Sequence, residues 1–212
     1  MEFKKEQKKY LRFNLRWLNN VRVDEWIERL DEPLSNGYTS ETQQKNIAWF
    51  LPRPKPDHYK GGMPLYAEEW LIQLAKDILK KQDIKLLNLF CGMNKHGVRF
   101  DIKEGLGADK IGDAHELSKH FMPSNKFDVI LADPPYSNEE SKKLYDVDIP
   151  LKYKKWTSEC DKVLEKGGIL IVYHKYVMPN PNPEKYEVVK RVFIGNRTRH
   201  LPRVAIYFKK KK

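Results

Sequence analysis

Short apolar runs that end in glycine or an acidic residue alternate along this chain with longer stretches whose apolar positions recur every three or four residues. The runs have the length of buried β-strands and cover residues 86–90, 98–100, 126–132 and 169–173. Apolar stripes predict helices over residues 64–81 and 150–166. Residues 188–194 and 204–208 are predicted to form a closing antiparallel pair of strands. The pattern predicts an α/β fold with a mostly parallel sheet.

The first 56 residues have a different pattern and are predicted to be a helical N-terminal extension that ends in a proline-rich linker. Residues 3–20 have the spacing of a basic amphipathic helix. Ser40 and Gln43 form a capping-box pattern ahead of residues 46–50, which are therefore predicted as a further helix. The aromatic faces of these helices are expected to pack on a core, with a stacking platform for bases as the alternative. The second predicted domain comprises residues 57–212.

Composition excludes several classes of protein. The chain has 212 residues and only two cysteines, Cys91 and Cys160, which form neither a disulfide framework nor a pattern with zinc-ligand spacing. No metal is expected. The N-terminus is charged and no apolar stretch approaches the length of a membrane span, so we expect a cytoplasmic protein without a membrane segment.

The positive charge is concentrated near the C-terminus. The net charge is +11, and residues 185–212 hold ten Lys or Arg and one acid, whereas the other 184 residues hold 30 basic and 28 acidic side chains. A basic surface attracts phosphates through counterion release, which predicts a nucleic-acid partner. Residues 209–212 are interpreted as a solubilising end. The arginines that interleave with the strand pattern are the predicted nucleic-acid contacts: Arg191, Arg197, Arg199 and Arg203.

The most specific motif is Asp133-Pro134-Pro135-Tyr136, directly after the apolar run 129–132. A carboxylate and a backbone carbonyl can accept both N–H groups of a planar amino group and restore its nucleophilic lone pair. Asp133 can supply the carboxylate and Pro134 the backbone carbonyl. The ring of Pro135 stiffens the segment, and Tyr136 can stack on a base. The tetrapeptide resembles the catalytic motif of class I S-adenosylmethionine-dependent amino-methyltransferases of nucleic acids, which have a Rossmann-like sheet.

That resemblance covers roughly residues 84–208 and implies a binding site for S-adenosylmethionine at the carboxyl ends of the strands. By position, Phe90 and Gly92 would line the cofactor and Asp101 would bind the ribose hydroxyls. Asp113 would accept a hydrogen bond from the adenine amino group, with Ala114 beside it.

The glycine loop departs from the family pattern. Met93 to Gly97 follow Gly92 without a third glycine at the family spacing, and nine residues separate Gly92 from Asp101. About 20 residues separate the glycine loop from the acid in dinucleotide-binding folds. We therefore expect a tight connection between two strands with no helix in it.

The resemblance implies methyl transfer to an exocyclic amino group, with DNA adenine N6 or cytosine N4 favoured over RNA guanine N2 or adenine N6. The sequence offers no separate target-recognition domain. Recognition would then come from the N-terminal extension, the basic tail, a partner or self-association. Two alternatives remain open: a non-catalytic nucleic-acid-binding protein with a degenerate methyltransferase fold, and a methyltransferase acting on a protein or small molecule.

Overall fold

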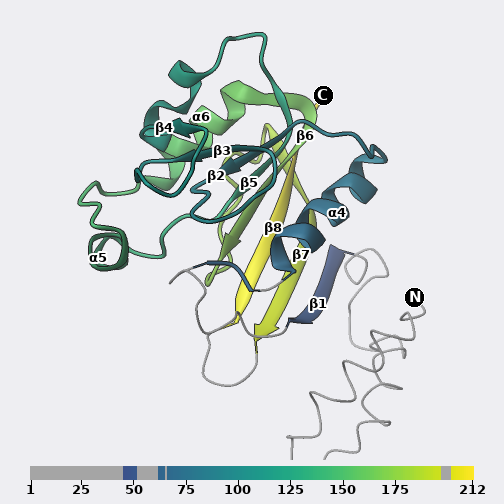
Figure 1. Cartoon of the computed structure of the whole chain (residues 1–212). Helices are drawn as coiled ribbons and strands as arrows, with labels where there is room; N and C mark the ends of the chain where they lie inside the picture. The colour runs from purple at the N-terminus through teal and green to yellow at the C-terminus, as the bar shows by residue number, and fades with distance from the viewer. Residues whose placement is uncertain (1–44, 52–61, 65, 197–201) are drawn as a thin grey trace, which may run out of the picture.

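A single mixed sheet organises the part of the chain that the computed structural model describes, which is residues 45–51, 62–64, 66–196 and 202–212. The order in the sheet is β1-β7-β8-β6-β5-β2-β3-β4. Strand β8 is antiparallel to both of its neighbours and the other pairs are parallel (Figure 1). The strands are β1 (Asn46–Leu51), β2 (Leu86–Leu89), β3 (Val98–Asp101), β4 (Lys110–Ile111), β5 (Phe127–Ala132), β6 (Leu164–His174), β7 (Tyr186–Asn196) and β8 (Arg203–Lys210).

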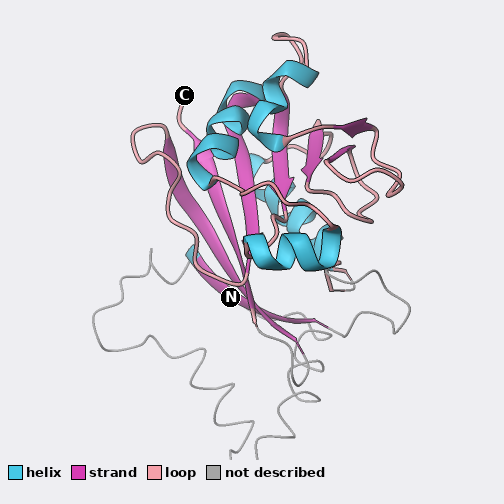
Figure 2. Cartoon of the chain, turned by 90° about the vertical axis from the view of Figure 1, so that its left-hand side faces the viewer, coloured by secondary structure: helices cyan, strands magenta, loops and turns pink. Residues whose placement is uncertain are grey.

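Helical segments pack against the strands (Figure 2). They are α4 (Ala67–Leu79), the 3₁₀ segment η1 (Ala114–His120), α5 (Asn138–Glu140), the π-helical turn η2 (Ser141–Tyr145) and α6 (Tyr153–Val163). Alternate residues of each strand point to opposite faces, which gives two apolar layers. One layer packs with Leu71 and Ala75 of α4, and the other packs with Trp156 and Cys160 of α6 and with Leu117 of η1.

The predicted α/β fold is confirmed in its strands and in its antiparallel pair of β7 and β8. Residues 90–97 join the parallel neighbours β2 and β3 without a helix, as the short spacing predicted. Gly97 has a φ of 73°, and a Cβ there would lie 2.5 Å from the carbonyl oxygen of Leu86. The close return of the chain therefore requires glycine at position 97.

The predicted helix over residues 46–50 is wrong, because these residues belong to β1 and pair in parallel with β7. Ile47, Trp49 and Leu51 face the apolar layer under α4, and the two residues between them are exposed. That alternation has the period of a strand. The other predicted helices of the extension, and the capping-box residues, lie outside the described residues, so the division at residue 57 stays a prediction.

Two helix boundaries also differ from the prediction. Helix α4 begins at Ala67 because Tyr66 has a left-handed backbone, with φ 68°, in place of the expected start at residue 64. Helix α6 ends at Val163. The predicted helix reached residue 166, but the residues from Leu164 onward, including the Gly-Gly pair at 167–168, belong to β6, whose pairing with β5 changes register between Phe127 and Val129.

Candidate functional site

A cleft opens at the carboxyl ends of β2, β3 and β5. Its wall contains every residue that the sequence predicted for the cofactor: Phe90, Gly92, Asp101, Asp113 and Ala114. Of the tetrapeptide, Asp133 and Pro135 line the cleft. Pro134 is buried, and neither it nor Tyr136 is part of the wall. The structure thus brings the two predicted groups of residues to one cavity.

The loop of residues 90–97 at the floor of this cleft is held by one acid that the sequence did not indicate. Glu68, in the first turn of α4, is 8% exposed. Its Oε1 accepts hydrogen bonds from Asn88 Nδ2 at 2.8 Å and from the backbone N–H of His96 at 3.0 Å. Both carboxylate oxygens lie 3.2 Å from the N–H of Lys95. Hydrogen bonds to the Glu68 carboxylate therefore fix the backbone of this loop, in which the glycines of the family pattern are missing.

The backbone of the same loop has two left-handed residues at the cleft. Phe90 has φ 56° and Gly92 has φ 50°. For phenylalanine this conformation is strained, and such strain is retained where surrounding contacts fix it. The Phe90 ring packs edge-on against Trp156 at 5.4 Å between centroids, which fixes it in the cleft wall.

Asp101 ends β3 and faces the loop. Its Oδ2 accepts a hydrogen bond from the N–H of Gly92 at 2.9 Å, and its Oδ1 accepts one from the N–H of Lys103 at 3.0 Å. A carboxylate has about four acceptor positions. The two backbone bonds therefore orient Asp101 and leave capacity for a pair of hydroxyl donors.

Asp113 is fixed by its neighbour His115. Its Oδ1 accepts from the N–H of His115 at 2.9 Å and lies 2.8 Å from His115 Nδ1. His115 Nε2 accepts from the N–H of Lys152 at 2.9 Å, so Nδ1 carries the proton in the neutral ring. Both of these contacts use Oδ1 of Asp113, and the residue lines the cleft. The same histidine ties the segment before α6 to the cleft wall.

Burial raises the pKa of the Asp133 carboxyl well above the ordinary value, although the residue lines the cleft and is only partly buried by solvent accessibility. The positive charge of Arg203 opposes that rise, and the charge of Glu140 adds to it. The backbone N–H of Asp133 donates to the carbonyl of Leu89 at 3.3 Å, which continues the sheet ladder by one residue. Asp133 is thereby positioned at the rim of the sheet, where partial burial disfavours the ionised form of its carboxyl.

Tyr136 lies beside the cleft within a basic cluster. Its hydroxyl accepts a hydrogen bond from Arg203 Nε at 2.6 Å, and the guanidinium carbon of Arg203 is 4.6 Å from the ring centroid. Lys175 Nζ is 5.4 Å from the same centroid, and the His174 ring packs edge-on at 5.0 Å. Burial and the nearby charges of Lys175 and Arg203 together lower the pKa of His174 to about 4, so this ring is neutral at pH 7.

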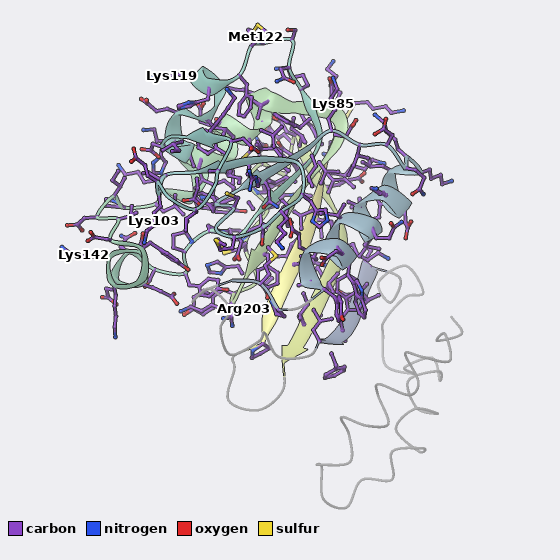
Figure 3. All side chains as sticks on the ribbon, viewed as in Figure 1. Lys85, Lys103, Lys119, Met122, Lys142 and Arg203 are labelled. Carbon is purple, nitrogen blue, oxygen red and sulfur yellow. The ribbon has the colours of Figure 1, made fainter. Side chains whose placement is uncertain are left out.

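The predicted nucleic-acid residues are distributed differently. Arg203 is the one that the structure places beside the tetrapeptide, and Figure 3 shows it at the start of β8. Arg191 lies within β7, opposite Ile206 of β8, and is not part of the cleft wall. Arg197 and Arg199 lie outside the described residues. Lys103, which the sequence analysis did not select, lines the cleft.

The outer wall of the cleft comes from a segment after the tetrapeptide. Residues 137–148 are polar and free of glycine, a composition that predicts a loop closing over the target base, but α5 and η2 form a short helical segment there. Tyr145, Val147, Ile149 and Leu151 all line the cleft. Their alternation with polar residues was the signal that could have identified this wall from the sequence.

Among the residues that the structure describes, the other chemically reactive groups do not form a second centre. Burial raises the pKa of the Cys91 thiol to about 12, so the thiol is neutral and packs as an apolar side chain. Within the described residues, no three His, Cys, Asp or Glu side chains are arranged to hold a metal ion. No helix in the described ranges is long and apolar enough to cross a membrane.

Comparison of the sequence with known proteins identifies a methyltransferase as a relative. The chain is 32% identical over 127 residues to the Type II methyltransferase M.BamHI of Bacillus amyloliquefaciens. The match covers 54% of this chain and 28% of that protein, so this chain spans a minor part of its relative's length. No protein-family model matches the sequence.

Comparison of the structure with solved structures identifies the fold. TrmN from Thermus thermophilus matches with a TM-score of 0.51 at 15% identity, over 70% of this chain and 49% of that one. The rRNA methyltransferase AviRa from Streptomyces viridochromogenes matches with a TM-score of 0.50 at 12% identity, over 74% and 88%. With the strand order above, these matches show a Rossmann-like methyltransferase sheet.

Proposed function

We propose that this chain is an S-adenosylmethionine-dependent methyltransferase that modifies an exocyclic amino group of a nucleic-acid base. One observation carries the proposal: a single cleft is lined by the acids at the ends of β3 and β4 and by the desolvated Asp133 of the tetrapeptide. The fold and the likeness to M.BamHI over 127 residues support the same reaction class.

The residues of the cleft suit the cofactor. Asp101 retains acceptor capacity for the two ribose hydroxyls, and Asp113 retains an oxygen for the adenine amino group. Apolar side chains that would enclose the flat adenine are Phe90, Ile102, Leu106 and Ala114. S-adenosylmethionine supplies an electrophilic methyl group on a sulfonium centre when it is bound.

The chain's own groups would act on the amino nitrogen. The Asp133 carboxylate accepts one N–H of the substrate and the carbonyl of Pro134 accepts the other, which returns the nitrogen lone pair from the ring. Asp133 is fixed at the rim of the sheet by its backbone bond to Leu89, so little reorganisation of this acceptor is needed as positive charge develops on the nitrogen. With cofactor and base bound, the cleft would hold the reacting atoms in line. A base in a duplex would have to leave the stack to reach this site.

DNA is the leading substrate in this proposal, with adenine N6 or cytosine N4 as the methylated atom. The Asp-Pro-Pro-Tyr sequence supports it. RNA is the second candidate, supported by the likeness of fold to an rRNA methyltransferase. A partner or a second copy of the chain is proposed to contribute to target recognition.

The test is methyl transfer from isotopically labelled S-adenosylmethionine to duplex DNA, tRNA and ribosomal RNA in separate reactions, followed by identification of the methylated nucleoside. An N-methylated adenine, cytosine or guanine supports the proposal and selects the substrate. Cofactor binding in calorimetry without transfer to any nucleic acid would leave the protein and small-molecule alternative. Absence of cofactor binding would favour the non-catalytic alternative.

The cofactor site gives a separate prediction. Asp101→Asn should weaken binding of S-adenosylmethionine by about 10- to 100-fold, because hydrogen bonds to a charged acceptor contribute about 1.5–3 kcal/mol each. Calorimetric titration measures this change. Asp109→Asn is the matched control, since Asp109 is exposed, lies outside the cleft and pairs with Arg99 at 2.8 Å. Equal affinities for the Asp101 and control variants would remove Asp101 from the cofactor site.

A further inference from the structure

Tyr173 is a buried tyrosine next to Asp133 that none of the preceding roles uses. Val172 of β6 pairs with Ala132 of β5, so the next residue on each parallel strand, Tyr173 and Asp133, are also neighbours. Their side chains leave the same face of the sheet because side chains alternate along both strands. Tyr173 is 1% exposed and belongs to the apolar layer under α4.

The hydroxyl of Tyr173 lacks a hydrogen-bond partner. Among the described residues, the buried side-chain oxygen or nitrogen atoms without one are Tyr173 Oη and Glu140 Oε2. A buried polar atom without a partner costs about 1–3 kcal/mol, so its presence in a native protein calls for an explanation such as a role in catalysis. Glu140 also acts on the charge of Asp133, so both atoms belong to the surroundings of the same carboxyl.

Electrostatics place the tyrosine hydroxyl near the tetrapeptide. Burial raises the pKa of Tyr173, and the charges of Asp133 and Tyr136 raise it further. The hydroxyl therefore keeps its proton at every pH at which the protein would work. It is a hydrogen-bond donor held by the sheet beside the tetrapeptide, behind the residues that form the cleft wall.

We propose that the Tyr173 hydroxyl donates a hydrogen bond to the ring nitrogen beside the amino group of the target base. This contact rests on the proposed function and assigns a substrate-binding residue to the same site. Adenine, cytosine and guanine each have an unprotonated ring nitrogen next to the exocyclic amino group. With Asp133 accepting the amino N–H and Tyr173 donating to the ring nitrogen, two adjacent atoms of the base are held, and its in-plane orientation is fixed.

Tyr173→Phe tests the contact because it removes the hydroxyl alone. We expect kcat/KM for methyl transfer to fall by about 10- to 100-fold, since the ring nitrogen of the bound base loses its donor. The affinity for S-adenosylmethionine, measured by calorimetry, should be unchanged. The melting temperature should be unchanged or higher, because the substitution removes an unpartnered polar atom.

Tyr207→Phe is the matched control from the neighbouring strand β8. Tyr207 is equally buried, but its hydroxyl donates to the carbonyl of Leu71 at 3.0 Å. Its loss should lower the melting temperature and leave kcat/KM unchanged. A tyrosine with a purely structural role would behave like this control, so the same pattern in Tyr173→Phe would overturn the proposal.

A substrate analogue separates the base from other partners of the hydroxyl. For the nucleoside that the wild-type protein methylates, the analogue has C–H in place of that ring nitrogen, as in 1-deazaadenine or 3-deazacytosine. On this analogue, kcat/KM of the wild-type protein should be lower by the same factor that Tyr173→Phe causes on the natural substrate. Tyr173→Phe should not lower kcat/KM on the analogue any further. Equal losses from Tyr173→Phe on both substrates, or a weakened cofactor affinity, would overturn the contact. Failure of the wild-type protein to methylate any nucleic acid would overturn the proposed function and this contact together.

Discussion

Asp133→Asn is expected to abolish methyl transfer while raising the thermal stability of the protein. Asparagine has nearly the same shape but places an N–H₂ group or a neutral carbonyl where the substrate requires a charged acceptor. Removal of one such preorganised group costs about 10²–10³ in kcat. Single-turnover transfer from labelled S-adenosylmethionine measures the loss, and calorimetry should show that the cofactor still binds.

The increase in stability follows from the raised pKa of Asp133. In the pH range between its ordinary pKa in the unfolded chain and its higher pKa in the folded protein, the folded state binds more protons. Stability therefore falls as pH rises through this range, and the ionised carboxyl destabilises the fold at neutral pH. Asparagine removes that charge, and each kcal/mol recovered should raise the melting temperature by about 2–4 °C.

Two measurements distinguish the loss of the Asp133 carboxylate from a general disturbance of the fold. The activity of the wild-type protein should rise with pH through the elevated pKa of Asp133, because the carboxylate is the active form. Asp83→Asn changes an exposed acid before β2 and should alter neither activity nor melting temperature. Retained methyl transfer in Asp133→Asn would eliminate the proposed mechanism. A lower melting temperature in this variant would show that contacts of the Asp133 carboxyl stabilise the fold more than its desolvation destabilises it.

The sequence predicted the fold where local pattern and tertiary environment agree. Strands β2, β5 and β6 are apolar on both faces because helices cover both sides of the sheet, so their runs are visible without any knowledge of pairing. Strand β1 was missed because exposed Ala48 and Phe50 are apolar as well, which hides the alternation with Ile47 and Trp49. Its pairing with β7, some 145 residues further along the chain, selects the strand.

The same distinction applies to the candidate site. Residues that follow a strand directly, such as Asp101 and Asp133, could be selected because the carboxyl ends of parallel strands meet at one edge. Residues whose role depends on contacts with distant parts of the chain could not be selected from the sequence. Tyr173 looks like any other strand residue until its hydroxyl is found without a partner. Glu68 looks like an ordinary acid in the first turn of a helix until the loop after β2 is seen to fold against it.

Glu68→Ala is expected to destabilise the protein and to weaken the cofactor site together. The carboxylate accepts hydrogen bonds from Asn88, Lys95 and His96, and its removal leaves these donors without their shared acceptor. Loss of a charged acceptor from a partly buried group of donors should lower the free energy of unfolding by about 3 kcal/mol. The loop that contains Gly92 would lose its anchor, so affinity for S-adenosylmethionine should fall by at least about tenfold.

Urea denaturation and calorimetric titration measure the two effects, and amide hydrogen exchange places them. The N–H groups of Lys95 and His96 should exchange faster in Glu68→Ala under native conditions, because they bond directly to the missing carboxylate. Glu69→Ala, one residue along the same helix and exposed, should stay within about 0.5 kcal/mol of the wild-type protein and bind cofactor normally. If Glu68→Ala lowered the free energy of unfolding but left the cofactor affinity unchanged, Glu68 would contribute to stability and not to the cofactor site. The shortened loop would then hold its binding conformation through Gly92, Gly97 and the bond from Gly92 to Asp101.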